Sequence, residues 1–593
     1  MAMFFFGGIF MTHMDGVALY AMTKELNTLL ENGRIERISK SGKFDYTFVV
    51  RANGKNSRLL ISADPESARI HLTEKGSESK EAVPPPFLML LRKHIAKGRI
   101  VDITMDSLDR IVTFFIVAAD ELGDLRRYRL IAEVMGKHSN LILVDEDGTI
   151  IDAAKRVYAD MSSVRTVLPG EKYIAPPAQE KASPMGFDFS TYFTSIQEPT
   201  KRAAAAITQG VLGVSPHSAR MLCAMAGVLA DAPLPLSDGD AAQLAGTCKS
   251  FFTMVEGGTG HPCILFLQDA PTAVFHTPVP GYDHRSFSTL SQAYDVYYAQ
   301  CLEEKQLVNA KAALRASVSD HLDKLYKRLG IQNDVLLNAE AYEADQHTGE
   351  LLLAYLYMIP KGAESCTLND YLTGEDVIIK LDASLNPQQN AQRYFKRSSR
   401  KKAALSAAQA QKDEIEPQVE YLQSVLHSIE TVTELGELRE IREELRDQGY
   451  LRQAPGSRKG EKQQQSQPVR FRSPDGIEIL VGRNNKQNDL LTTRIARSTD
   501  MWFHVQGMPG SHVVVRHKAP LPSDTMVAAL NIAAYYSRGR NSANVPIDVT
   551  AIKNVRKPAG AKPGYVIFTQ QRTYFITPDE KLVKSLLWER EEN

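Results

Sequence analysis

Residues 107–144 read SLDRIVTFFIVAADELGDLRRYRLIAEVMGKHSNLILV and contain three strand-like runs. Ile111–Val117 is β-branched and aromatic, which is typical of a buried strand. Residues 128–135 alternate between two faces, as the side chains of a strand do. Leu141–Val144 leads into Asp147-Gly148, which is a hairpin signal. These runs predict neighbouring strands of one sheet.

Polar residues lie at both ends of these strands. Asp109 and Arg110 precede the first strand, and the turn 133–140 (EVMGKHSN) separates the second from the third. A carboxylate beside a guanidinium, near Lys and His, can bind a folded polyanion and read a hydroxyl or a base edge. An ordinary surface ion pair at a strand start is the alternative. The candidate RNA-binding residues here are Asp109, Arg110, Glu133, Met135, Lys137 and His138.

Length and composition set the outer limits. The chain has 593 residues, with 70 Lys and Arg against 70 Asp and Glu, so several domains are expected and the overall charge names no partner. Five scattered Cys without a CxxC pair favour a reducing compartment over disulfides or zinc. No run reaches membrane-spanning length. Met1–Phe10 is apolar but lacks a basic start and a cleavage site, so it is interpreted as an extension or start-site artefact.

The sheet belongs to a predicted α+β domain over residues 11–180. Asp15–Leu30 has helical periodicity, and Asn53-Gly54 predicts a hairpin turn. Pro84–Pro86 starts a further helix, and Pro176-Pro177 begins a linker.

Residues 200–260 are helical and Ala-rich. Within them, Val211–Pro216 has the pattern of a helix-hairpin-helix, whose backbone N–H groups can hold a phosphate. A plain αα-corner has the same pattern. Residues 262–285 are strand-like and are expected to return to the first domain.

Residues 286–450 predict a long antiparallel coiled coil with a small tip. Apolar residues recur at heptad-like spacing after Leu307 and again after Ile415, and arms of roughly 40 residues would span about 60 Å. Pro417 should kink or restart the second helix. Leu368–Leu381 predicts a β element at the tip. The basic run KRSSRKK (396–402) is either a solvated helix face or a phosphate contact, and its candidate residues are Arg397, Arg400 and Lys401.

A polar low-complexity linker, 451–469, precedes a last α+β domain at 470–593. That domain holds 18 Lys and Arg against 11 Asp and Glu, a net charge of +7. Aromatic and histidine side chains beside Gly-rich backbone suit base stacking, although Trp502 also fits plain core packing. The candidate RNA-binding residues are Trp502, His504 and His512, together with Lys553, Arg556, Lys557 and Lys562 of a basic Gly/Pro loop.

Several motifs in fixed order resemble the NFACT family. The matching residues are Asp15-Gly16, Thr23–Leu26, Pro85–Phe87, Leu91–His94, Asp109-Arg110, Glu133–Asn140, Asn390–Phe395, Asp500–His504, Pro509–Val513 and Lys557–Gly564. The resemblance covers nearly the whole chain from Asp15 to Pro578. Met1–Phe10 and Pro417 depart from the family pattern.

The resemblance implies a glycosylase-like NFACT-N domain, a helix-hairpin-helix, a coiled-coil arm and an RNA-binding NFACT-R domain. It implies a cytoplasmic ribosome quality-control factor that binds the obstructed large ribosomal subunit with peptidyl-tRNA. Such proteins recruit alanine tRNA, so that the stalled chain gains a C-terminal alanine tail without mRNA. Asp109 and Arg110 match the pair needed for tailing. Further implied partners are rRNA and a small RNA-binding helper protein, and neither a cofactor nor a membrane is expected.

Two other functions fit parts of the pattern. A glycosylase-like DNA-binding protein would need an N-terminal Pro nucleophile and a zinc finger, whereas Asp15 follows Met14 and no Cys quartet occurs. A fibronectin-binding surface adhesin would need an export signal. The sequence shows no recognisable nucleophile–base set, so the protein is expected to position RNA and not to be an enzyme.

Overall fold

A computed structural model describes residues 12–76, 84–339, 341–452 and 466–588. The chain divides into two compact units, residues 1–305 and 306–593, and each is described by itself. The Met1–Phe10 extension and most of the predicted 451–469 linker lie outside the described residues. Within the described part, no helix is long and apolar enough to cross a membrane.

The first unit contains an antiparallel sheet that has nine strands among the described residues, in the order β4-β3-β2-β1-β5-β6-β7-β8-β9. The strands are β1 (Arg34–Lys40), β2 (Asp45–Ala52), β3 (Lys55–Ser62), β4 (Arg69–Leu72), β5 (Arg99–Thr104), β6 (Ile111–Ala119), β7 (Leu125–Glu133), β8 (Asn140–Val144) and β9 (Ile150–Ala153). The strands expected around residues 107–153 are therefore confirmed. Helices α1 (Gly16–Leu30) and α2 (Pro86–Ile95) share a buried apolar core with this sheet.

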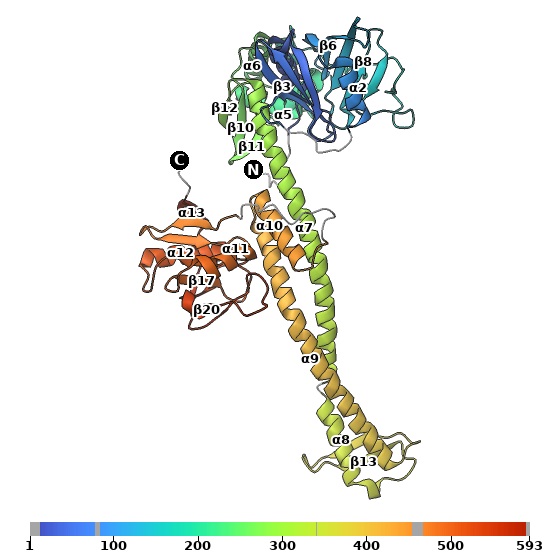
Figure 1. Cartoon of the computed structure of the whole chain (residues 1–593), viewed down its shortest axis with the longest axis vertical. Coiled ribbons are helices and arrows are strands. Elements are labelled where there is room, and N and C mark those ends of the chain that lie inside the picture. The colour runs from blue at the N-terminus through green and yellow to red at the C-terminus, as the bar shows by residue number, and fades with distance from the viewer. Residues whose placement is uncertain (1–11, 77–83, 340, 453–465, 589–593) are drawn as a thin grey trace. The chain divides into compact units, whose positions relative to one another are not determined.

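A helical layer and a small sheet complete this unit (Figure 1). The helices are α3 (Phe189–Ser195), α4 (Ala203–Gly210), α5 (Pro216–Ala226) and α6 (Asp238–Gly257), and the strands are β10 (Cys263–Leu267), β11 (Ala270–Phe275) and β12 (Asp283–Ser286). Strand β10 alternates between two cores: Ile264 packs with the large sheet, and Cys263 and Leu265 pack with the helices. One strand thus joins both layers.

The second unit begins within α7 (Leu290–Ala339) and contains a long helix pair (Figure 1). The other elements of this part are α8 (Tyr342–Ala354), η2 (Leu356–Met358), β13 (Ser365–Asn369), β14 (Asp376–Lys380), α9 (Pro387–Thr431) and α10 (Leu435–Asp447). Lys311 Nζ donates to the Glu430 carbonyl, whereas Gln423 donates to the Tyr326 hydroxyl further along. Residue numbers rise on α7 as they fall on α9, so the two helices are antiparallel. The β element expected at the tip is confirmed.

Helix α9 runs unbroken from Pro387 to Thr431 with Pro417 inside it. The expectation that Pro417 restarts the helix is wrong. Ile415 and Val419, on either side of Pro417, are buried in the same apolar cluster with α7. We infer that this packing offsets the backbone hydrogen bond that a proline cannot donate.

The last domain contains an antiparallel sheet in the order β15-β16-β18-β17-β19-β22, with α12 packed on it. Its elements are β15 (Val469–Arg472), β16 (Glu478–Val481), α11 (Asn485–Leu490), η3 (Leu491–Ile495), β17 (Met501–Val505), β18 (Val513–Val515), α12 (Ser523–Tyr535), β19 (Val545–Ala551), η4 (Ile552–Asn554), β20 (Val555–Arg556), β21 (Ile567–Phe568), β22 (Arg572–Ile576) and α13 (Glu580–Ser585). The helix expected over 484–494 is α-helical only to Leu490 and continues as a π-turn. The chain is a mixed α and β multidomain protein, as the sequence predicted.

Replacing Pro417 by Ala should stabilise the helix pair, because Ala restores an N–H donor inside α9 and removes the ring clash. We expect a gain of about 1–3 kcal/mol, measured as a shift of the helical unfolding transition followed by circular dichroism. Glu414→Ala, at an exposed position of the same helix, is the control and should shift stability by no more than about 0.5 kcal/mol. A loss of stability in Pro417→Ala would contradict this account.

Candidate nucleic-acid interface

Within the first unit, the buried carboxylate of Asp15 links two helix starts. Its Oδ1 accepts from the Ala18 N–H at 2.9 Å and caps the start of α1. Its Oδ2 accepts from the Ser215 N–H at 3.1 Å and from the Ser218 hydroxyl at 2.6 Å, at the start of α5. One side chain therefore joins the N-termini of two helices, where a negative charge is favoured. This internal carboxylate already accepts from the Ser215 N–H, so that donor at the start of α5 is not available to a phosphate.

Two glycines let this junction approach the turn that carries the Asp109-Arg110 pair. A Cβ on Gly16 would lie 2.2 Å from the Leu108 carbonyl oxygen and 2.5 Å from Gly213 Cα. Gly213 has a φ of +80°, which suits glycine, and its carbonyl accepts from the Val17 N–H at 3.2 Å. The residue just before Asp109 is thus clamped against backbone from two distant segments.

Asp109 and Arg110 are half-buried, and the Asp109 carboxylate has hydrogen-bond partners other than Arg110. Asp109 accepts from Gln179 Nε2 at 3.1 Å and from the Ser107 hydroxyl at 3.2 Å. Arg110 has a φ of +64°, which costs a non-glycine residue about 1 kcal/mol or more. In the described part of the chain, no ion pair joins the two side chains, so the alternative of an ordinary Asp109–Arg110 pair is not what the structure contains.

The second motif lies directly beside the first. Ile111 pairs with Glu133 across β6 and β7, and the Val134 N–H donates to the Arg110 carbonyl at 2.9 Å. Lys137 and His138 are exposed on the short helical turn η1 (Gly136–His138). The sheet register therefore places the Lys137 and His138 side chains next to the Asp109-Arg110 turn.

Glu133 and Met135 support this turn from within. The buried Glu133 carboxylate accepts from Arg165 at 2.6 Å and from the Tyr173 hydroxyl at 2.9 Å. Burial, and then this carboxylate, raise the pKa of Tyr173. The Met135 N–H donates to the Ser139 hydroxyl at 2.7 Å. Any effect of Glu133 on RNA would be transmitted through the turn, because its side chain has no exposed surface.

Sequence reasoning missed three residues at this site: His13, Gln179 and Lys305. Burial lowers the pKa of His13, and the nearby charges of Arg110 and Lys305 lower it further. Lys305 pairs with Glu66, in a turn that lies beside Gly136. No local motif marks these residues, because each is far from residues 107–138 in sequence. The exposed or half-buried cations and histidines form what we call the basic edge: His13, Arg110, Lys137, His138 and Lys305.

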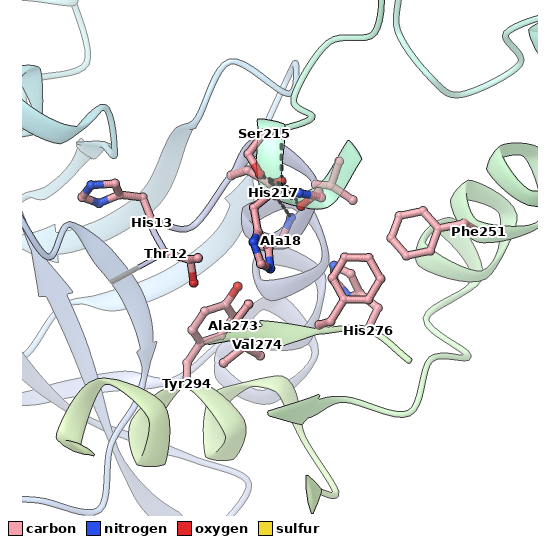
Figure 2. Close-up of a pocket in the computed structure, with 14 residues that line it drawn as sticks. Thr12, His13, Ala18, Ser215, His217, Phe251, Ala273, Val274, His276 and Tyr294 are labelled. Carbon is pink, nitrogen blue, oxygen red and sulfur yellow. Dashed lines mark hydrogen bonds between the residues drawn. The ribbon is translucent and has the colours of Figure 1, made fainter. Parts of the chain in front are cut away.

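A small cavity of about 20 Å³ lies beside Asp15 (Figure 2). Figure 2 shows His217, His276 and Tyr294 around this space. Burial lowers the pKa of His276 to about 4, and His217 Nε2 has no hydrogen-bond partner among the described residues. The volume suits one water molecule and excludes a nucleotide. In the described part of the chain, no group of three His, Cys, Asp or Glu side chains could hold a metal.

Part of the basic run of α9 makes contacts within the chain. Arg397 Nε donates to Asp345 of α8 at 2.7 Å, and Lys401 Nζ lies 2.7 Å from the same carboxylate. Burial opposes the charged form of Asp345, but Arg397 and Lys401 lower its pKa overall. Arg400 is exposed. Two of the three predicted residues therefore fasten α8 to α9, and Arg400 faces solvent.

In the basic Gly/Pro loop, too, some cations have partners within the chain and others are exposed. Lys557 pairs with Asp489. Lys562 donates to Gln448 at 2.9 Å and lies over the rings of Tyr421 and Tyr450. Lys553 and Arg556 are exposed. A phosphate can therefore reach these last two without breaking a contact of the kind that Lys557 and Lys562 make.

The aromatic candidates of β17 lie together. Trp502 is fully buried, as plain core packing requires, with His504 and His512 against its ring at centroid distances of 5.6 and 5.3 Å. His512 is also buried, whereas His504 is partly exposed. Of the three, His504 has the ring that a ligand could touch.

Comparisons with known proteins place the whole described chain in context. Residues 15–466 match the NFACT N-terminal and middle domains, and residues 467–570 match the NFACT protein RNA binding domain. A curated protein of Bacillus subtilis (strain 168), "Rqc2 homolog RqcH", is 36% identical over 580 residues, covering 96% of this chain and 99% of that protein. The protein of the same name from Streptococcus suis (strain 05ZYH33) is 34% identical over 581 residues, with the same coverage.

Among solved structures, the C-terminal part of the fibronectin/fibrinogen-binding protein from Streptococcus suis is 31% identical. It covers 48% of this chain and 99% of that one, with a TM-score of 0.38.

Replacing Asp15 by Ala should destabilise the first unit by about 2–4 kcal/mol, because it removes a helix cap and two further hydrogen bonds to a charged group. Asp188→Ala is the control, since exposed Asp188 caps only α3 and should cost about 1 kcal/mol. Urea unfolding of both variants measures the difference. Equal losses would mean that the link to α5 contributes nothing.

Proposed function

The chain belongs to the NFACT family, and from that membership we propose that it is a cytoplasmic ribosome quality-control factor. It binds the large ribosomal subunit that is obstructed by peptidyl-tRNA. Relatives named "Rqc2 homolog RqcH", at 34–36% identity over 96% of the chain, support this proposal. The match of residues 467–570 to an RNA-binding domain supports rRNA and tRNA as its partners.

The finer proposal is that the protein recruits alanine tRNA, so that stalled chains receive a C-terminal alanine tail without mRNA. The ribosomal RNA forms the peptide bond, and this protein positions the tRNA. It acts as a binding protein and not as an enzyme. A small RNA-binding helper protein is a further proposed partner.

The observation that carries this proposal is the way in which the Asp109-Arg110 turn is held. Backbone of Gly16 and Gly213 confines Leu108, Gln179 holds the Asp109 carboxylate, and β7 bonds to the Arg110 carbonyl. An Arg with a left-handed backbone conformation persists in a fold only where the surrounding contacts fix that conformation. Such backbone strain clusters at binding sites. The turn is therefore pre-organised, which reduces the ordering cost of binding RNA.

The basic edge next to this turn supplies the complementary charge. Phosphate contacts from cations fix orientation on RNA, while a carboxylate and a guanidinium can read base edges or 2′-hydroxyls. Lys137, His138 and Arg110 provide the first kind of contact, and Asp109 with Arg110 provides the second. This division of roles suits selection of one tRNA among many.

Replacing Asp109 and Arg110 by Ala should abolish alanine tailing and leave the fold intact, because both side chains reach the surface. Tails on a stalled reporter are measured by mass spectrometry in cells that express the variant. The matched control replaces exposed Asp106 and Arg127, which lie near the same strands, by Ala and should retain tails. Normal tailing in the Asp109/Arg110 variant would refute this role.

Replacing exposed Lys553 and Arg556 by Ala should weaken RNA binding and flatten its salt dependence. Each lost phosphate contact lowers the slope of log K against log salt by roughly 0.7–0.9, so the pair should lower it by about 1.5. Lys518→Ala with Lys581→Ala removes the same charge from exposed positions of the same domain. If both pairs change the slope equally, the loop has no particular part in binding.

A further inference from the structure

The second unit contains a cleft of about 550 Å³, lined by the last domain and by α9, and this volume is within the range of sites for small organic ligands. Two glycine-rich loops, 507–510 and 560–564, line it, together with Trp502 and His504 of β17 and Tyr421 of α9. All these residues belong to one compact unit. The cleft is distinct from the Asp109-Arg110 turn, which belongs to the other unit.

An aromatic column forms one wall of the cleft. Phe568 packs on Trp502 at 4.8 Å between ring centroids, and His504 stacks on the indole at 5.6 Å with 9° between planes. Trp502 is fully buried, and His504 is partly exposed. The column therefore ends in the His504 ring, which lines the cleft and is partly exposed.

The two histidines also hold the loops that frame the cleft. His504 makes a backbone hydrogen bond with Gly510, and His512 makes one with Gly564 and one at 2.7 Å with the Thr492 hydroxyl. Burial lowers the pKa of His504 to about 4, so its ring is neutral at pH 7. A neutral flat ring favours stacking over charge pairing with phosphate.

Both a hydrogen-bond donor and a hydrogen-bond acceptor occur around this wall of the cleft. The buried Trp502 indole N–H has no acceptor among the described residues, which is uncommon for a buried donor. The Asp548 carboxylate lines the cleft as an acceptor, and Gln506 donates to it at 3.3 Å. A nucleobase would complement these groups. It has a π face for stacking, and at its edge it has ring atoms that accept hydrogen bonds and exocyclic amines that donate them.

We propose that this cleft binds one unpaired nucleotide, with its base stacked on His504. The proposal deepens the proposed RNA-binding function, because it assigns to the last domain a site for a single-stranded base. Exposed Lys553 and Arg556, on the chain that leads into the 560–564 loop, carry the charge for the adjoining phosphates. The same chemistry could come from an RNA strand or from a free nucleotide.

The chain has two tryptophans, so Trp588→Phe leaves Trp502 as the one fluorescent indole. Full-length Trp588→Phe protein is titrated with a short single-stranded oligoadenylate, with adenosine 5′-monophosphate and with an RNA duplex. We expect saturable quenching by the single strand and none by the duplex. Quenching by the monophosphate at equal affinity identifies a free nucleotide as sufficient; tighter binding of the oligomer identifies an RNA strand.

Adding His504→Ala should weaken single-strand affinity by roughly ten-fold or more, since stacking is lost. His504→Phe keeps a flat ring and should restore affinity, which separates stacking from a folding defect. His517→Ala, at a histidine that does not line the cleft, is the matched control.

Equal affinity in the Ala and Phe variants and the parent, or no quenching, overturns the proposal. Co-sedimentation of each variant with large ribosomal subunits is measured in parallel. Intact subunit binding without quenching would overturn the cleft and leave the proposed function standing. Quenching without subunit binding would overturn the proposed function and leave the proposal for the cleft standing.

Discussion

The buried Asp15 carboxylate is the contact on which the first unit depends. Its two oxygens satisfy donors at the starts of α1 and α5, which lie 200 residues apart in the chain. A buried charge is tolerated only when hydrogen bonds surround it, so both helices must stay in register with it. Gly16 and Gly213 are small for the same reason: any side chain there would force the two helix starts apart. The position of the Asp109-Arg110 turn depends on this contact.

More of the Lys and Arg side chains proposed for RNA binding are paired within the chain than the sequence suggests. Of seven cations proposed for RNA in the arm and the last domain, Arg397, Lys401, Lys557 and Lys562 have partners within the chain. A Lys or Arg that is already paired gives less to a phosphate, since binding would first break the internal contact. Arg400, Lys553 and Arg556 are exposed and have no such partner among the described residues, so they are the cations most available to RNA.

Much of the fold could be predicted because it follows local rules. The strands around Ile111–Val144 follow from β-branched runs and from the Asp147-Gly148 turn, and the helix pair follows from apolar spacing. The predicted restart of the helix at Pro417 was wrong, because α9 continues through this residue and packs with α7 on both sides of it. It was incomplete at the site, because Gln179, His13 and Lys305 reach the Asp109-Arg110 turn through tertiary contacts.

The amino-acid sequence by itself determined which residue types are present, where strands and helices form, and that Asp109, Arg110, Lys137 and His138 belong to neighbouring turns. These follow from periodicity and turn chemistry, which act over a few residues. Tertiary structure alone decided which side chains stay exposed: it buried Glu133, paired Lys557 and left His504 open beside a cleft. Exposure depends on what packs from distant segments, and no short stretch of sequence contains that information.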